Sequence, residues 1–270
     1  MPEPVAPKPC HPDSFPSETV VPIHRCRTAR STNDLAREWI QHDPESPIAV
    51  WIAEEQTGGR ATRGRSWASP PGGLWMTMAA QLHDSHPLPG LSLRVGLAMI
   101  RSVRSVLDPD AAARLRLRWP NDLIALQPDS DSIAKLGGCL IEHLSPWVII
   151  GLGINANNAP PSLDPDGKPL RTPAASLSEV GKQPINIDAL ATDLADQLRR
   201  LVPLAGLPAT THSEIESLLY RPSGPISIEQ RDGSLLRGQI RGIAHEPPHT
   251  GSLILQTDKG EILVSAGEFR

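Results

Sequence analysis

Residues 54–67 read EEQTGGRATRGRSW, a short loop that places three glycines and three arginines between two apolar runs. Glycine lets a backbone approach a ligand closely and adopt positive φ, and successive backbone N–H groups in such a turn form an anion-binding concavity. Arginine forks bind the oxygen atoms of carboxylates and phosphates in pairs. The loop therefore suits a small, multiply anionic ligand, although on its own it fits a solvated basic loop or a nucleic-acid contact equally well.

The composition narrows these interpretations. The chain has 270 residues, a formal net charge of −4 and a pI of about 6.1, which argues against a protein that mainly binds nucleic acid. No apolar run approaches the ~20 residues that span a bilayer, and residues 1–16 lack the apolar core of a signal peptide. The 3 cysteines have no metal-ligand spacing, so we expect a reducing, cytoplasmic environment.

Apolar periodicity predicts the elements around the loop. We expect a helix that opens at Ser31–Asp34 and is capped by Ser31 or Thr32. A capping box from Thr211 to Glu214 predicts a further helix start. The predicted strands are 48–53, 74–79, 115–118, 123–126, 133–144 and 147–154, and the predicted further helices are 88–107, 188–201 and 211–220.

The chain divides into three predicted parts. Residues 1–18 are rich in proline and lack periodicity, so we expect a disordered tail. Residues 19–220 carry the predicted strands and helices of the main domain. From residue 221 short strands separated by turns predict a small β-barrel, residues 221–270. Within the main domain, the proline-rich loop 157–173 is long enough to close over a ligand.

Two further motifs carry polar groups into apolar surroundings. Trp119-Pro120-Asn121-Asp122 interrupts a strand, because proline cannot donate to a ladder. Lys135 lies inside an otherwise apolar strand, just before Gly137 and Gly138. Such a lysine either reaches solvent at a sheet edge or points into a polar site, and the adjacent glycines favour the site because they permit close approach of a ligand.

Taken in order, these motifs resemble those of the biotin protein ligases, over roughly residues 20–265. The resemblance implies an α+β fold: a class II synthetase-like catalytic domain, with a mixed or antiparallel sheet flanked by helices, and a small C-terminal SH3-like β-barrel. Without a DNA-binding module before residue 25, the chain resembles the monofunctional ligases. The motifs are Ser31-Thr32-Asn33, 56–67, 118–123, Lys135-Leu136-Gly137-Gly138-Cys139, 151–155 and Ala175-Ser176-Leu177.

The resemblance implies a reaction in two steps. The carboxylate of biotin attacks the α-phosphate of ATP, which gives biotinyl-5′-adenylate and pyrophosphate. A lysine of a biotin carboxyl carrier protein, such as the subunit of acetyl-CoA carboxylase, then attacks the acyl carbon. The implied substrates are ATP and biotin with Mg²⁺ as cofactor; the protein would be a monomer or homodimer in the cytoplasm, with no DNA or membrane partner.

This chemistry explains the residue types. A carboxylate with a pKa of ~4 is already ionised, so the first step needs positive charge rather than a base, and Arg60, Arg63, Arg65, Lys135 and Mg²⁺ can supply it. In the second step the acceptor lysine, with a pKa of ~10.4, must lose a proton. Asp122 is a candidate to act as a base, to orient the amine or to bind Mg²⁺, and a turn-forming role after proline is the structural alternative.

The resemblance also implies a role for each motif residue. Lys135, Arg60 and Asp122 would be catalytic, with Asp122 as the candidate magnesium ligand. The biotin side would be lined by Ser31, Thr32, Asn33, Gln56, Gly59, Arg60, Lys135 and Gly138. The nucleotide side would be lined by Arg63, Arg65, Trp67, Asn121, Asn155 and Ser176.

The sequence departs from the family pattern at a few positions. The family's loop reads Gly-Arg-Gly-Arg-x-Gly-Arg, whereas this chain has Ala61 and Thr62 in place of the second glycine and second arginine. Arg118 replaces the usual lysine, which keeps the charge but changes its shape. Cys139 takes an aliphatic position, where a small hydrophobe is harmless.

Two alternatives remain beside the ligase. A lipoate or octanoate ligase or transferase shares the catalytic architecture, but the arginine loop and the Trp-Pro-Asn-Asp motif resemble the biotin branch. A non-catalytic sensor of biotin or its adenylate is the other, and Thr62 favours it while Lys135 and Asp122 oppose it. ATP–pyrophosphate exchange that depends on biotin separates a ligase from a sensor.

The missing arginine at position 62 predicts a weakly ordered loop and an adenylate that escapes more readily. We expect the Thr62→Arg variant to retain its adenylate longer than the natural chain, because a further guanidinium can bind the intermediate. The measurement is the half-life of the adenylate on the purified protein. An unchanged half-life would contradict the idea.

Overall fold

The computed structural model describes residues 21–42, 44–82, 88–128, 132–161, 170, 172–230 and 232–269. The expected tail, residues 1–18, and part of the expected closing loop lie outside them. The strands are β1 (Ile23–Ala29), β2 (Ile48–Gln56), β3 (Leu74–Gln81), β4 (Leu115–Arg118), β5 (Asp122–Leu126), β6 (Ile133–Leu144), β7 (Trp147–Ile154), β8 (Ile226–Glu229), β9 (Leu235–Ile243), β10 (Leu253–Thr257), β11 (Gly260–Val264) and β12 (Glu268–Phe269). The helices are α1 (Thr32–Ile40), the 3₁₀ turn η1 (Thr62–Gly64), α2 (Leu91–Arg104), α3 (Pro109–Ala113), α4 (Leu177–Gly181), α5 (Ile187–Leu201) and α6 (Ala209–Leu218).

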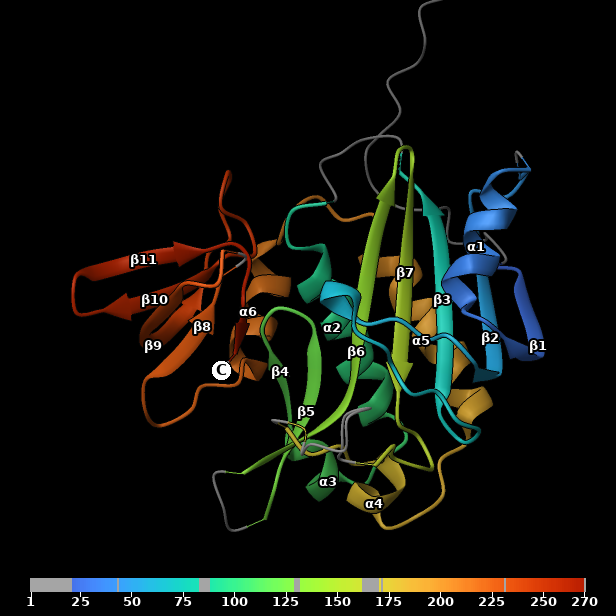
Figure 1. Cartoon of the computed structure of the whole chain (residues 1–270), viewed down its shortest axis with the longest axis horizontal. Coiled ribbons are helices and arrows are strands. Elements are labelled where there is room, and N and C mark those ends of the chain that lie inside the picture. Colours follow the sequence, from blue (N-terminus) through green and yellow to red (C-terminus); the bar gives the residue numbers. More distant parts are fainter. Residues whose placement is uncertain are drawn as a thin grey trace, which may run out of the picture.

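The first seven strands form one mixed sheet in the order β1-β2-β3-β7-β6-β5-β4 (Figure 1). β1 and β2 run parallel, and the other neighbours are antiparallel. The apolar runs that predicted these strands are buried, as expected of strands at the centre of a sheet. The mixed sheet flanked by helices confirms the coarse fold that the sequence predicted.

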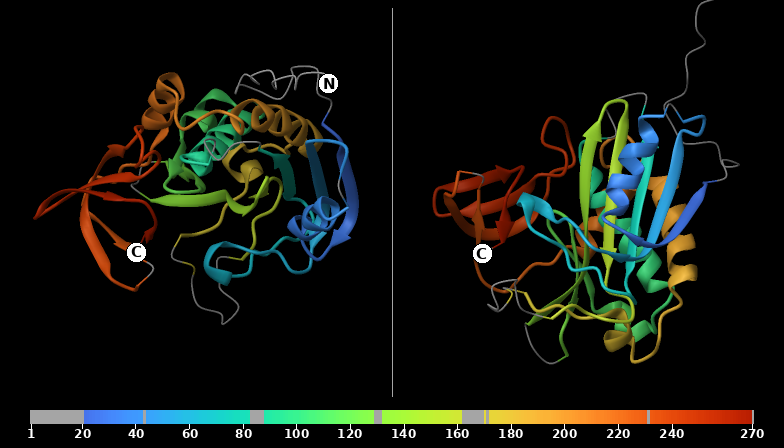
Figure 2. Two further views of the ribbon diagram at one scale, coloured as in Figure 1. Left: turned by 90° about the horizontal axis from the view of Figure 1, so that it is seen from above. Right: turned by 45° about the vertical axis from the view of Figure 1, so that its right-hand side comes forward.

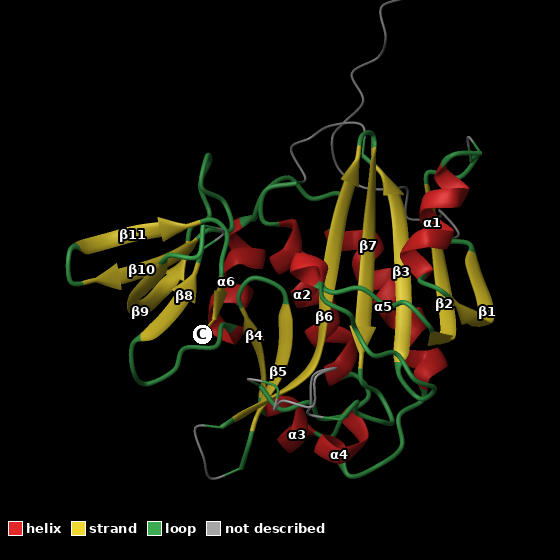
Figure 3. Cartoon of the chain, in the orientation of Figure 1, coloured by secondary structure: helices red, strands yellow, loops and turns green. Residues whose placement is uncertain are grey.

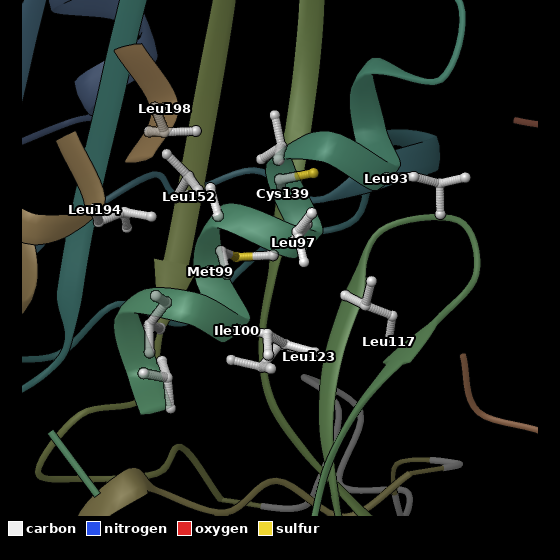
Figure 4. Packing of buried hydrophobic residues seen from close by; sticks show 14 of the residues in the cluster. Leu93, Leu97, Met99, Ile100, Leu117, Leu123, Cys139, Leu152, Leu194 and Leu198 are labelled. Atoms are coloured by element: carbon white, nitrogen blue, oxygen red, sulfur yellow. The ribbon is translucent and has the colours of Figure 1, made fainter. Parts of the chain in front are cut away.

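One face of this sheet is buried under α2 and α5, which lie side by side on it (Figure 2). Leu97 and Ile100 of α2 point toward Leu117 and Leu123 of the sheet (Figure 4). These side chains belong to one large cluster of buried apolar residues, and burying such a side chain stabilises the fold by about 1.5–3 kcal/mol. Apolar packing therefore attaches this face of the sheet to the two helices.

The opposite face is covered only in part. Here α1 packs on β2, β3 and β7, and a small cluster that includes Ala36, Trp51 and Trp147 lies beneath it. Further along β7 the residues on this face are Gly151 and Gly153. Because glycine has no side chain, other groups can approach the strand there.

A β-bulge in β6 changes which side chains share a face. Leu123 of β5 pairs with Gly137, but the next residue, Ile124, pairs with Lys135. In a regular strand residues three apart point to opposite faces, yet Leu136 and Cys139 both lie in the apolar core. The extra residue of the bulge produces this change of face.

The last strands form a second sheet in the order β11-β10-β9-β8-β12, set beside the first sheet with α6 between them (Figure 3). β11 and β12 are its two edges, so in the described residues the sheet is open and not a closed barrel. An open five-stranded sheet thus stands where the sequence predicts an SH3-like β-barrel. Among the described residues no helix is long and apolar enough to cross a membrane.

Strand β1 was not predicted from the sequence. Its residues include His24, Arg25 and Arg27, and most of the strand is exposed at the edge of the sheet. Apolar periodicity detects strands that bury a face, and β1 buries little. The predicted helix over 88–107 is shorter, because Gly90 with φ 73° precedes its first residue.

Two predicted caps also differ in the structure. α6 begins at Ala209, two residues before Thr211, and Glu214 pairs with Arg101 of α2 through contacts of 3.0 and 2.5 Å instead of closing a capping box. Ser31 occupies the N-cap of α1 but makes no side-chain cap hydrogen bond. A capping box does form at the start of α4, between Ser176 and Glu179.

A buried arginine joins α2 to the end of α5. The side chain of Arg94 is fully buried and donates to the carbonyl oxygens of Leu201 at 2.9 Å, Val202 at 3.3 Å and Pro89 at 3.0 Å. The last carbonyls of a helix have no partner within it, so Arg94 satisfies groups that would otherwise be buried unpaired. Burial lowers the pKa of Arg94 to about 10, which leaves it charged at neutral pH.

We expect Arg94→Met to lower the free energy of unfolding by about 2–4 kcal/mol, because the carbonyl groups lose their donor while remaining buried. Urea denaturation followed by circular dichroism measures the change. Arg104→Met, on the exposed end of the same helix, is the control and should change stability by less than about 0.5 kcal/mol. Equal effects of the two substitutions would contradict this role of Arg94.

Candidate functional site

Most of the predicted site residues gather on the partly covered face of the seven-stranded sheet. Gly151 allows Asn33 of α1 to lie directly on β7, since a side chain at Gly151 would collide with the Asn33 amide. Gly153 does the same for the indole of Trp67, which comes from the arginine loop. The two glycines therefore let the start of α1 and the arginine loop meet over one strand.

A buried hydrogen-bonded cluster lies at the start of α1. The hydroxyl of Thr32 is 2.7 Å from that of Thr77, which donates to Asn33 Oδ1 at 2.7 Å. Gln56 Oε1 accepts from the backbone N–H and the hydroxyl of Thr32, at 2.8 and 3.1 Å. Gln56 Nε2 donates to Ser69 Oγ at 2.9 Å. These bonds fix the side chains of Thr32, Asn33 and Gln56, which the sequence predicted for the biotin side of the site.

Arg60 lies beside this cluster. Its Nη2 is 2.7 Å from Asp34 Oδ1 and 3.8 Å from Glu142 Oε1, and Glu142 also accepts from Asn33 Nδ2 at 2.8 Å. The close contact with Arg60 lowers the pKa of Asp34 and, in return, raises that of Arg60. Arg60 is therefore a fixed cation at the edge of the cluster.

A second cluster joins two cations to one carboxylate. Asp122 Oδ1 is 2.5 Å from Lys135 Nζ, and Asp122 Oδ2 is 2.6 Å from Arg118 Nη2 and 3.1 Å from Arg118 Nε. Arg118 Nη1 donates to Thr172 Oγ1 at 2.7 Å. The turn at Pro120 places Arg118 and Asp122 opposite each other on β4 and β5, and Gly138 leaves room for the carboxylate.

Asp122 is ionised at neutral pH. Its burial raises the pKa of the carboxyl, but the charges of Lys135 and Arg118 and their hydrogen bonds outweigh this effect, so the pKa lies below its ordinary value. A divalent cation at this carboxylate would meet two side-chain cations already in contact with it. The arrangement therefore disfavours magnesium at Asp122, and no group of three metal-binding side chains occurs in the described parts of the chain.

Trp67 covers the lysine. The Lys135 ammonium lies 5.1 Å from the centre of the Trp67 ring, within the range of a cation–π interaction. The indole Nε1 is buried and has no hydrogen-bond partner in the described part of the protein. Gly59 permits the loop to close at this point, because its carbonyl accepts from Trp67 N at 2.9 Å and a side chain there would collide with the loop.

Three predicted nucleotide-side residues form backbone contacts. Asn121 Nδ2 donates to the carbonyl of Cys139 at 2.7 Å. Asn155 Nδ2 donates to the carbonyls of Ala175 at 3.1 Å and Lys135 at 3.4 Å, and its buried Oδ1 has no partner among the described residues. Ser176 caps α4. Asn121 and Asn155 thereby hold β6, the strand that carries Lys135, in place.

Arg63 and Arg65 do not join the Lys135 cluster. Both contact carboxylates of the C-terminal sheet: Arg63 Nη1 is 3.4 Å from Glu229 Oε2, and Arg65 Nη1 is 2.5 Å from Glu268 Oε1. Thr62 supports Arg65, whose Nη2 donates to the Thr62 hydroxyl at 3.3 Å. The arginines of the predicted loop therefore face two ways. Arg60 lies at the seven-stranded sheet, whereas Arg63 and Arg65 face the C-terminal sheet.

Several residues that contact the predicted site residues were not predicted from the sequence. Thr77 and Glu142 each interrupt an apolar strand, and a polar residue at such a position is the signal that could have found them. Asp34 was assigned only to the first turn of α1. Glu229 and Glu268 carry no local signal, since both are ordinary glutamates in short strands.

Comparison with known proteins identifies related chains. The model of the biotin/lipoate A/B protein ligase family matches residues 25–155. A biotin–[acetyl-CoA-carboxylase] ligase of Mycobacterium tuberculosis is 29% identical over 224 residues, which cover 81% of this chain and 77% of the relative. The biotin protein ligase of Leishmania major in complex with biotin has a TM-score of 0.63 at 25% identity and covers 90% of this chain and 98% of its own.

The fold is also similar to that of a biotin protein ligase from Aquifex aeolicus, whose structure holds biotin and ATP. The TM-score is 0.70 at 20% identity, and the match covers 92% of this chain and 97% of the other. At this identity the similarity concerns the fold. It includes the C-terminal sheet as well as the main sheet, because so little of either chain is left unmatched.

Asp122→Asn should destabilise the protein by about 3 kcal/mol at pH 7, because two partly buried cations lose their counter-ion. A carboxyl whose folded-state pKa is lowered contributes stability above its ordinary pKa of about 4, and this contribution is lost as pH falls through the lowered value. The stability difference between the natural chain and the variant should therefore narrow in acid. Urea denaturation at a series of pH values measures it.

Asp188→Asn is the matched control, because Asp188 pairs with Arg25 at the surface and is 77% exposed. It should change stability by less than about 1 kcal/mol at any pH. A difference between the natural chain and Asp122→Asn that stays constant down to pH 3 would contradict the shared-carboxylate arrangement.

Proposed function

Because residues 25–155 match the model of the biotin/lipoate A/B protein ligase family, we propose that this chain is a biotin protein ligase. It activates biotin with ATP to biotinyl-5′-adenylate and transfers biotin to a lysine of a carrier protein. The observation that carries the proposal is the position of Lys135, which lies between Asp122 and the ring of Trp67 on the glycine-lined face of the sheet. The relatives named above as biotin ligases support the same activity.

In the first step two anions must meet, so the site has to supply positive charge. Lys135, Arg118 and Arg60 are the cations that the fold brings to this face, from β6, β4 and the arginine loop. The carboxylate of biotin needs no base, since its pKa is ~4. We assign Lys135 and Arg60 to the binding of the reacting oxygens, and Mg²⁺ to the ATP phosphates rather than to Asp122.

In the second step the acceptor lysine must lose its proton. The lowered pKa of Asp122 makes this carboxylate a weak base, and both of its oxygens already hold cations. We therefore assign Asp122 a positioning role: it fixes Lys135 and Arg118. This role differs from the three that the sequence left open, namely a base, a group that orients the acceptor amine and a magnesium ligand.

The remaining assignments follow the motifs. The cluster of Ser31, Thr32, Asn33, Gln56, Gly59 and Gly138 would line the biotin side together with Arg60 and Lys135. Trp67, Asn121, Asn155 and Ser176 would lie toward the nucleotide, together with Arg63 and Arg65. The buried Asn155 Oδ1 and Trp67 Nε1, which lack partners in the described residues, support this placement, because buried polar atoms of native proteins are normally paired.

The wider setting is part of the proposal. The acceptor is a biotin carboxyl carrier protein of acetyl-CoA carboxylase or a similar carboxylase, the class that the name of the Mycobacterium tuberculosis relative indicates. Residues 19–220 form the catalytic domain, and 221–270 form the SH3-like domain. The reaction takes place in the cytoplasm and involves neither DNA nor membrane.

Incubation of a biotin carrier domain with the protein, ATP, Mg²⁺ and biotin should add one biotin to one lysine, as measured by mass spectrometry. Lys135→Ala should abolish the adduct, or slow its formation by at least about 10²-fold, because a cation that stabilises developing charge is lost. Lys259→Ala, in the exposed β10–β11 turn, is the control and should retain full activity. Thermal denaturation of both variants verifies that they are folded.

Lipoate in a parallel reaction tests the rival substrate. A lipoyl adduct without a biotinyl one would replace the proposal by a lipoate ligase. No adduct with either acid, together with no biotin-dependent ATP–pyrophosphate exchange, would favour the sensor.

A further inference from the structure

Two carboxylates lie side by side at one edge of the C-terminal sheet. Glu229 is the last residue of β8, and Glu268, the first residue of β12, is its direct partner in the antiparallel pairing. Both side chains are mostly buried, with 18% and 27% of their surface exposed. Like charges placed opposite each other on neighbouring strands repel, so this pair requires a cation.

The arginine loop supplies that cation. Arg63 Nη1 is 3.4 Å from Glu229 Oε2 and 3.5 Å from Glu268 Oε2, and Arg63 Nη2 donates to the Glu229 carbonyl at 3.0 Å. Arg65 adds the contact of 2.5 Å with Glu268. The guanidinium of Arg63 therefore bridges the two carboxylates.

These contacts hold the loop in an unusual backbone conformation. Arg63 has φ 60° and ψ 31°, the left-handed region that residues other than glycine seldom adopt. Such a conformation persists where surrounding contacts over-determine it, and the contacts here come from the carboxylate pair. The loop is thus docked on the C-terminal sheet by charge.

We propose that Glu229 and Glu268 form a carboxylate latch, which occupies Arg63 and Arg65 before the nucleotide binds and with which the triphosphate competes. The inference rests on the proposed function, because it takes ATP as the incoming anion. Arginine forks fit carboxylate and phosphate oxygens with the same geometry, so the same two side chains serve the latch and the nucleotide.

The charges decide the direction of the exchange. ATP brings a triphosphate with several negative charges, whereas the adenylate that remains after pyrophosphate leaves carries a single ionised phosphate oxygen. The triphosphate draws the arginines from the latch more strongly than the adenylate does. The latch therefore opens for ATP and closes again over the intermediate.

The same strand also reaches the Asp122 cluster. Phe269 follows Glu268 in β12, and the Arg118 guanidinium lies 5.8 Å from the centre of its ring, within cation–π range. A displacement of β12 would therefore change the contact of Phe269 with Arg118, which in turn binds Asp122. The latch therefore links the C-terminal sheet both to the arginine loop and to the Asp122 cluster.

The test uses the full chain with Glu268→Gln, which keeps the size of the side chain and the pairing of β12 but removes the charge. Without the competing carboxylate, the KM for ATP in biotin-dependent ATP–pyrophosphate exchange should fall about two- to fivefold at saturating biotin. Glu246→Gln is the control, because Glu246 is 82% exposed and lies away from the loop. It removes the same charge and should leave KM unchanged.

A second readout follows the loop itself. In the absence of nucleotide, trypsin should cleave after Arg63 and Arg65 several times faster in Glu268→Gln than in the natural chain. An unchanged or higher KM for ATP, or unchanged cleavage, would overturn the latch, since mere loss of packing raises KM. Absence of exchange in the natural chain would instead refute the proposed function, so the two failures are distinguishable.

Discussion

The burial of one face of the seven-stranded sheet under α2 and α5 determines where every polar group of the site can lie. With that face filled by apolar side chains, the charged groups of the site have only the opposite face, where α1 covers β2, β3 and β7 and where Gly151 and Gly153 let Asn33 and Trp67 lie directly on β7. Burying charge is costly unless it is paired. The site therefore consists of linked pairs, in which each cation is held by a carboxylate.

Asp122 is the centre of the strongest of these pairings. Its carboxylate is surrounded by protein and shared between Lys135 and Arg118, which belong to different strands. The arrangement keeps two like charges close together at modest cost, because each is attracted to the carboxylate more strongly than it is repelled by the other. An anionic substrate thus meets cations that are already oriented and largely desolvated, which is the condition for effective electrostatic stabilisation.

The sequence predicted the central strands and the main site motifs because their signals are local. The apolar runs of β3, β6 and β7 and the lysine beside two glycines can be read within a few residues. Edge strand β1 was missed, since exposed strands lack periodicity. The strands of the C-terminal sheet were expected, but whether they close into a barrel depends on long-range pairing that local patterns do not show. The partners of Arg63 and Arg65 lie 166 and 203 residues further along the chain, beyond the reach of any local pattern.

The bulge in β6 sets how many residues must separate Lys135 from Glu142. Lys135 and Glu142 are an odd number of residues apart, so in a regular strand their side chains would point to opposite faces. The bulge supplies the one change of parity that brings both to the same face, where Lys135 reaches Asp122 and Glu142 reaches Asn33. The spacing between them is therefore as much a determinant of the site as their identity. Removal of a single residue with the bulge retained would turn one of the two charges into the apolar core, whereas removal of the extra residue of the bulge itself would leave a regular strand with both charges on one face.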